Sequence, residues 1–170
     1  MGKDDPVSKA NTGLWNSGID SDKDLARARK RKLSYYSNIL VLEDSVNKDN
    51  EGKVMLFRYG KKIFEKITGV MNPEFKDETP LNPFDFWEGA DFKIKIRQVD
   101  GYVNYDKAEF AAPSPLLGGD DAKCEEVWKQ QHLLQELISP DNFKTYQELE
   151  ARFNTVVARD AGSEFVGTIE

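Results

Sequence analysis

Cysteine and histidine are almost missing from this sequence, which has one of each among 170 residues, Cys124 and His132. A single cysteine excludes an internal disulfide framework and is typical of a reducing compartment. One cysteine and one histidine cannot complete a four-ligand zinc site, so we expect no metal cofactor unless carboxylates or a second chain supply ligands. We expect Cys124 to be an inert thiol, and His132, next to two leucines, to be structural or exposed rather than catalytic.

Long apolar runs and catalytic motifs are also absent. No run approaches the roughly 20 apolar residues that span a bilayer, and the first 13 residues contain no apolar signal-peptide core. Gly118 and Gly119 are not followed by the Lys-Ser/Thr pair of a phosphate-binding loop, and no acidic pair has a spacing that indicates a metal-dependent nuclease. We therefore expect no membrane partner and no enzymatic activity.

Charge is distributed unevenly along the chain. The net charge is −6 at pH 7, but residues 27–66 carry 11 cations and 5 anions, whereas residues 67–170 carry 10 cations and 20 anions. This asymmetry predicts a basic face on an otherwise acidic body. The acidic remainder would limit non-specific adhesion and favour solubility.

Aromatic rings are interleaved with the cations of this basic block. Five cations occur within residues 27–32, Tyr35 and Tyr36 follow, and residues 54–62 add two more rings and three cations. A charge run alone is explained equally well by a solvated face, but cations for phosphates combined with rings for bases indicate single-stranded nucleic acid. Since adjacent residues of a strand point to opposite faces, only one of Tyr35 and Tyr36 need face solvent.

The candidate nucleic-acid-binding residues belong to this block and to the strand-like segments after residue 90. They are Lys30, Arg31, Lys32, Tyr35, Tyr36, Phe57, Arg58, Tyr59, Lys61, Lys62, Lys93, Lys95, Tyr102 and Tyr105, with Arg97 continuing the row of Lys93 and Lys95.

Hydrophobic periodicity predicts an α+β fold, namely a small OB-type β-barrel with C-terminal helices. Strands are expected over residues 33–42, 54–59, 90–99 and 102–105, with turns at 47–52 and 100–101. Helices are expected over residues 61–70 and 121–138 and again over about 143–157. Three prolines make residues 71–87 an irregular crossover, with buried aromatic residues at Phe75, Phe84, Phe86 and Trp87.

The expected domain organisation follows from these segments. It comprises an N-terminal loop segment (1–26) with a short helix start at 21–26, an OB-like core (27–110), a linker (111–122), a helical extension (123–158) and a frayed tail (159–170).

Four segments resemble one known family in matching order. They are KRKLSYYSNILVLED, NEGKVMLFRYGKKIFEKI, FWEGADFKIKIRQVDGYVNYD and FKTYQELEARFNTVV, within residues 30–157. They are similar to the single-stranded DNA-binding, helix-destabilising proteins of T-even bacteriophages (the gene 32 protein family), in a form like those of cyanophages. The resemblance implies an OB-fold whose basic, aromatic-lined cleft coats and protects single strands during viral replication, recombination and repair. It also implies phage replication and recombination proteins as partners, and the cytoplasm of the infected bacterium as the location.

The resemblance assigns roles to several candidates and leaves three family features without a counterpart. It implies phosphate contacts for the cations at 30–32, further positive charge from those at 58, 61 and 62, and a place in the cleft for Tyr35 or Tyr36 and for Tyr102 and Tyr105. The family's basic N-terminal arm, the three cysteines and histidine of its zinc subdomain, and its acidic C-terminal tail have no match. We therefore expect the latter part of the core, without the first barrel strands and without zinc.

A second hypothesis comes from a different functional class. The basic face could dock an acidic partner within the phage replication machinery, which would make the chain a protein-interaction module. Removal of aromatic rings discriminates between the two hypotheses, because a stacking groove needs its rings and a surface that docks an acidic protein does not.

Overall fold

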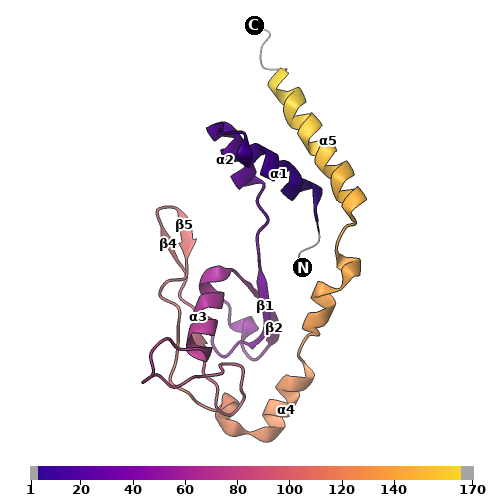
Figure 1. Cartoon of the computed structure of the whole chain (residues 1–170). Helices are drawn as coiled ribbons and strands as arrows, with labels where there is room; N and C mark the ends of the chain where they lie inside the picture. The colour runs from indigo at the N-terminus through magenta and orange to yellow at the C-terminus, as the bar shows by residue number, and fades with distance from the viewer. Residues whose placement is uncertain (1–3, 166–170) are drawn as a thin grey trace. The chain divides into compact units, whose positions relative to one another are not determined.

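The computed structural model describes residues 4–165, with side chains up to residue 158, and combines helices with short antiparallel sheets (Figure 1). The chain divides into two compact units. One unit is formed by Met1–Lys32 with Gln135–Glu170, and the other is Leu33–Leu134.

The first unit begins with two helices where the sequence predicted a loop with a short helix start at residues 21–26. The loop prediction was wrong for the first helix, whereas the second helix includes the expected helix start. Helix α1 spans Pro6–Asn16 and α2 spans Asp20–Ala28. Asp5 caps α1, because its carboxylate accepts a 2.7 Å hydrogen bond from the backbone N–H of Ser8, and Pro6 occupies the first turn, where a missing N–H costs nothing. The polar composition of this segment resembles a loop, but a capping residue followed by proline is sufficient to start a helix.

The long helix α5, Tyr146–Phe165, packs against α1 within the same unit. Lys9 lies 5.8 Å from the ring centre of Tyr146, and Arg29 lies 5.5 Å from that of Phe153. The short 3-10 helices η3 (Leu134–Ile138) and η4 (Pro140–Asn142) precede α5. The sequence predicted a frayed tail from residue 159, but the helix continues to Phe165; residues 166–170 lie outside the described part of the chain.

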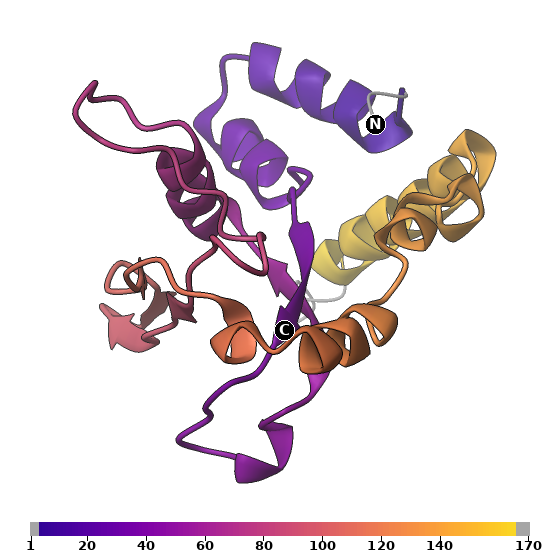
Figure 2. The same cartoon turned by 90° about the horizontal axis from the view of Figure 1, so that it is seen from below.

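The second unit is organised by an antiparallel hairpin and a helix, as the sequence predicted. Strand β1 (Tyr35–Leu40) pairs with β2 (Val54–Tyr59), and the connection contains the 3-10 helix η1 (Lys48–Asn50). Helix α3 (Lys61–Met71) follows directly and buries Ile63 and Ile67 against Tyr59. This apolar cluster forms the core of the unit. Figure 2 shows the backbone from below.

The expected strand over residues 90–99 is two separate strands. Strand β3 (Phe92–Lys93) pairs with β6 (Glu109–Phe110), while β4 (Arg97–Val99) pairs with β5 (Tyr102–Asn104). Because the two halves have different partners, the backbone leaves the strand conformation between them, and Ile96 is 65% exposed rather than buried. The turn between β4 and β5 was predicted correctly, and Asp100 and Gly101 both have positive φ, as a two-residue hairpin turn requires.

Three two-stranded sheets form in the second unit, and over residues 4–165 they do not join into a closed barrel. The expected barrel is therefore not observed, since β3 and β6 contain only two residues each and cannot link the hairpins into one sheet.

Two further predictions for this unit need correction. The 3-10 turn η2 (Leu116–Gly119) leads into helix α4, which spans Asp121–Lys129 and ends well before residue 138. Residues 72–91 are irregular, as predicted, but their aromatic side chains are not a buried set. Phe75, Phe84 and Trp87 are 67%, 49% and 58% exposed, and Phe86 is half-buried. The core is already filled by rings from β1, β2, α3, β3 and β6.

Candidate nucleic-acid interface

The pairing register of β1 and β2 determines which candidate rings share a face. Tyr35 lies opposite Tyr59, Tyr36 opposite Arg58 and Ser37 opposite Phe57. Since side chains alternate along a strand, Tyr35, Ser37, Phe57 and Tyr59 share the inner face. Tyr36 and Arg58 form a cross-strand pair on the outer face.

The inner-face rings hold the fold together. The ring of Tyr35 stacks on Phe64 of α3 with 3.9 Å between the ring centres and an interplanar angle of 7°. Tyr59 is only 8% exposed, and its hydroxyl shares a 2.8 Å hydrogen bond with the buried hydroxyl of Ser37. Phe57 and Tyr105 are half-buried and also pack on the core cluster. These four candidate rings therefore have a structural role whatever else they do.

The outer-face pair is accessible. Tyr36 is 41% exposed, and the exposed guanidinium of Arg58 makes no ion pair or hydrogen bond with any residue in the described part of the chain. The next outer-face residue, Asn38, is occupied, because its side chain exchanges two hydrogen bonds of 2.9 and 3.0 Å with the backbone of His132. A ring beside an unpaired cation can stack on a base and neutralise the neighbouring phosphate.

The candidate cations differ in how far the protein itself engages them. Arg31 lies 3.3 Å from Asp5, and Lys61 lies 3.3 Å from Glu65 one helical turn ahead, so both are paired. Within residues 4–158, no carboxylate forms an ion pair with the exposed side chains of Lys30, Lys32, Lys62, Lys93 or Lys95. Lys30, Arg31 and Lys32 belong to the first unit and the other candidates to the second.

The β4–β5 hairpin exposes a ring and sequesters a cation. Tyr102 is 79% exposed. Arg97, which the sequence placed in a row with Lys93 and Lys95, instead pairs with Asp106 through two hydrogen bonds, one of them 2.8 Å from Nε. The Arg97 guanidinium lowers the pKa of the Asp106 carboxyl to about 2. Arg97 is therefore neutralised locally and is less available to a phosphate than Lys93 or Lys95.

A cleft of about 1010 Å³ runs through the second unit. Five candidates line it: Tyr35, Tyr36, Phe57, Tyr59 and Lys93. Its remaining lining is largely apolar, and its charged side chains are three carboxylates and a single lysine, so the cleft itself is not basic. The other cations lie outside this lining. Within the second unit, Lys93 is thus the one candidate cation in the lining of the cleft, whereas Arg58, Lys61, Lys62 and Lys95 are not part of it.

Several rings that line the cleft were not among the sequence-based candidates. They are Phe64, Phe84, Phe86, Phe92 and Phe110. Phe92 and Phe110 pack together across β3 and β6 with 4.6 Å between ring centres. A phenylalanine in an apolar pattern has no feature that separates a cleft-lining ring from a core ring, so only the strand pairing reveals this set.

No metal centre is found among the side chains that the structure describes, residues 4–158, where no three of the His, Cys, Asp and Glu side chains are placed to hold an ion. Cys124 is buried, and its thiol is directed to the carbonyl of Leu116 at 3.5 Å. One buried thiol and one histidine do not fit the three-cysteine, one-histidine zinc site that the sequence resemblance raised. None of the helices over these residues is long and apolar enough to cross a membrane.

Comparison with known proteins identifies relatives along most of the chain. A family model described as "gp32 DNA binding protein like" matches residues 1–157. The single-stranded DNA-binding protein of Enterobacteria phage T2 is 40% identical over 134 residues, which are 78% of this chain and 44% of that protein. The protein of the same description from Enterobacteria phage T4 is 41% identical over 130 residues, 75% of this chain and 43% of that protein. The chain therefore spans less than half the length of these relatives.

Proposed function

Since the chain belongs to the gp32-like family of phage single-stranded DNA-binding proteins, we propose that it binds single-stranded DNA without regard to sequence. In this role it coats and protects strands during viral replication, recombination and repair in the cytoplasm of the infected bacterium. The observation that carries the proposal is the match to this family over residues 1–157.

The outer face of the β1–β2 hairpin supports the proposal chemically. Tyr36 offers an accessible ring, and Arg58, directly opposite, offers an unpaired cation. Every base has a π-face, so stacking on a tyrosine holds a strand without selecting its sequence. A duplex hides these faces between its base pairs, which gives the preference for single strands.

The start of α3 supports a phosphate contact next to this pair. Its N-cap is Gly60, which has no side chain to satisfy the first backbone N–H groups of the helix. Lys61 and Lys62 occupy the first turn, and Lys62 has no ion pair with the residues that the structure describes. Free N–H groups at a helix N-terminus beside a cation favour an anion.

We place the strand across the hairpin face and the start of α3, with the cleft receiving bases. Phosphates then meet Arg58, Lys62 and Lys93, while bases reach Tyr36 and the apolar lining beyond it. The strand thereby avoids the carboxylates of the cleft. In this proposal the hairpin is one wall of an OB-type binding fold, and the protein acts by mass action without catalysis.

Salt dependence tests the phosphate part of the proposal. Binding to a thymidine oligonucleotide is measured at several salt concentrations, and the slope of log affinity against log salt counts the neutralised phosphates. Lys62→Glu is expected to weaken binding and reduce the slope by about 1. The matched control is Lys76→Glu, the same charge change at an exposed lysine of the irregular segment. Equal effects of both variants would show only a response to net charge and would contradict this placement of the strand.

Ring removal tests the alternative protein-docking function. If the basic face docks an acidic protein, Tyr36→Ala leaves binding of an acidic peptide unchanged and oligonucleotide binding is weak from the start. If the face binds DNA, the same substitution weakens oligonucleotide binding at every salt concentration.

A further inference from the structure

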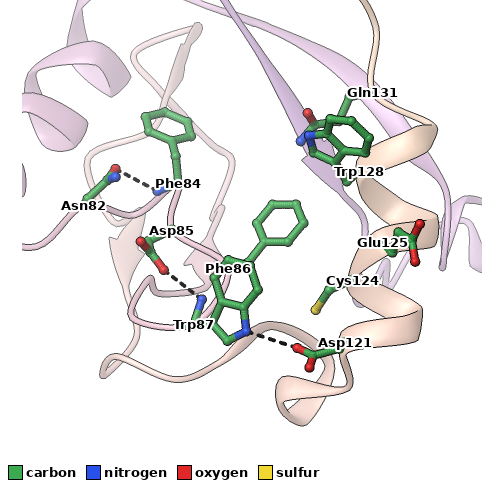
Figure 3. A pocket seen from close by; sticks show the side chains of 10 residues that line it. All are labelled: Asn82, Phe84, Asp85, Phe86, Trp87, Asp121, Cys124, Glu125, Trp128 and Gln131. Carbon is green, nitrogen blue, oxygen red and sulfur yellow. Dashed lines mark hydrogen bonds between the residues drawn. The ribbon is translucent and has the colours of Figure 1, made fainter.

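A pocket of about 780 Å³ in the second unit has a different chemistry from the hairpin face (Figure 3). It lies between the irregular segment before β3 and helix α4. Four of its side chains are aromatic, three are carboxylates, and none is a cation. The lining residues are Asn82, Phe84, Asp85, Phe86, Trp87, Asp121, Cys124, Glu125, Trp128 and Gln131.

The wall that carries Trp87 is built tightly. One carboxylate oxygen of Asp85 accepts hydrogen bonds from the backbone N–H groups of Trp87 and Glu88, at 2.8 and 2.9 Å. Gly89 is buried, and a Cβ at this position would lie 2.1 Å from the carbonyl oxygen of Asp85. The backbone N–H of Leu116 donates to the carbonyl of Phe86 at 2.7 Å and ties the segment to the chain before α4. These hydrogen bonds hold the backbone of this wall in place, so the pocket is preformed in this unit.

The tryptophan rings of the pocket are unusually accessible for their size. Trp87 is 58% and Trp128 is 64% exposed. The indole N–H of Trp87 points to the carboxylate of Asp121 at 3.4 Å, which places a ring and a negative charge side by side (Figure 3). Large apolar side chains gathered at one exposed place are typical of an interaction surface.

The carboxylates at this pocket are incompletely neutralised. Glu125 pairs with Lys129 at 2.6 Å. Asp85 and Asp121 have no cationic partner among the side chains that the structure describes. The hydrogen bonds from the backbone of Glu88 and Trp87 lower the pKa of Asp85, so this carboxylate is charged at neutral pH. Residues 82–91 as a whole contain three anions and no cation.

We propose that this pocket docks an arginine- and lysine-rich segment of a partner protein. A guanidinium or ammonium group over an indole face is attracted by the ring quadrupole, and the two unpaired carboxylates supply the counter-charge. The attraction of the pocket for a basic segment follows from its own rings and carboxylates. Four of its lining residues, Phe84, Asp85, Phe86 and Gln131, also line the cleft. A nucleic acid does not fit the site, because its phosphates would face Asp85 and Asp121 with no cation between them.

A second copy of this chain is a poorer occupant than a separate partner. The basic run at residues 27–32 is the strongest cationic segment of the sequence. Its arginines are already engaged in part, since Arg27 pairs with Asp24 at 2.5 Å and lies over Trp15, and Arg31 pairs with Asp5. Docking into a neighbouring copy would also withdraw the lysines of this run from the phosphate contacts that the family resemblance implies for them, an argument that rests on the proposed function.

The test uses the full chain and a synthetic eight-residue peptide of alternating arginine and alanine. The indole N–H signals of Trp87 and Trp128 are followed by NMR at low salt, and Trp15, in the first unit, is the internal control. We expect saturable shifts of Trp87 and Trp128 and none of Trp15. A peptide of alternating glutamate and alanine should shift none of the three.

Two substitutions define the site. Asp121→Asn and Trp128→Ala are each expected to weaken peptide binding about threefold, because an exposed ion pair and an exposed cation–π contact each contribute modestly. Asp49→Asn, in η1 and outside the pocket, removes the same charge and should change binding less than 1.5-fold. Oligonucleotide affinity should be unchanged in Trp128→Ala, since Trp128 does not line the cleft.

Three results would overturn the proposal. One is the absence of Trp87 and Trp128 shifts in the unsubstituted chain. Another is a loss in Asp49→Asn equal to that in Asp121→Asn, which would indicate net charge alone. The third is self-association by sedimentation, without peptide, that Asp121→Asn abolishes, because the occupant would then be a second copy.

Discussion

Replacing Tyr36 by alanine should separate DNA binding from stability. The ring is 41% exposed on the outer face of the hairpin, while its neighbour Tyr35 is stacked on Phe64 at 3.9 Å. Base stacking on an aromatic ring contributes about 1–3 kcal/mol. Because Tyr36 as a residue is already partly covered, we take the lower part of that range, about 1–2 kcal/mol. Tyr36→Ala should therefore weaken oligonucleotide binding about 5- to 30-fold.

Titration of a thymidine oligonucleotide at one fixed salt concentration measures this effect, with circular dichroism to establish that each variant is folded. Tyr36→Phe is the matched control and should bind within about twofold of the unsubstituted chain, since it keeps the ring. Tyr35→Ala should instead lower the free energy of unfolding by about 3 kcal/mol, because it removes a stacked core ring. Unchanged affinity in Tyr36→Ala, or an equal loss in Tyr36→Phe, would refute base stacking at this position.

Three further predictions concern the framework of the site. Tyr59→Phe leaves the buried hydroxyl of Ser37 without its partner and should lower the free energy of unfolding by about 1–3 kcal/mol in denaturant titrations. Arg97 lowers the pKa of Asp106 to about 2, so the contribution of this pair to the free energy of unfolding should be complete above about pH 4 and lost as pH falls through about 2. An NMR titration of the carboxyl that gives an ordinary pKa near 3.9 would contradict the pairing. Gly89→Ala should destabilise the second unit by about 1–3 kcal/mol, because the new Cβ collides with backbone, and an unchanged melting temperature would count against the tight turn.

The hairpin and helix that hold the candidate site follow from local sequence patterns. Alternating apolar residues flank a polar turn at 47–52, and the apolar spacing after Gly60 is helical, so β1, β2 and α3 were predicted nearly to the residue. The turn at Asp100 and Gly101 was equally predictable from the sequence, because few residues accept positive φ.

The features that the sequence did not reveal depend on contacts with residues outside each local pattern. Alternation showed that Tyr35 and Tyr36 face opposite ways, but only the ring of Phe64 on α3 determines that Tyr35 is the inner one. Arg97 looked equivalent to Lys93 until Asp106, nine residues later, was found beside it. The strand expected over residues 90–99 divides because its halves find partners in β6 and β5, which no local pattern encodes.

Helix α1 was missed for a different reason. Its polar composition resembles a loop, and the prediction gave too little weight to Asp5 and Pro6 as a helix start. A capping residue followed by proline was the available signal.

Quenching of intrinsic fluorescence by single-stranded and duplex oligonucleotides of equal length tests the central claim most directly. We expect saturable quenching by the thymidine strand at low salt, reversal of that quenching by added salt, and much weaker binding of the duplex. Equal affinity for strand and duplex, or no quenching by the strand in a folded protein, would contradict single-stranded DNA binding by this chain.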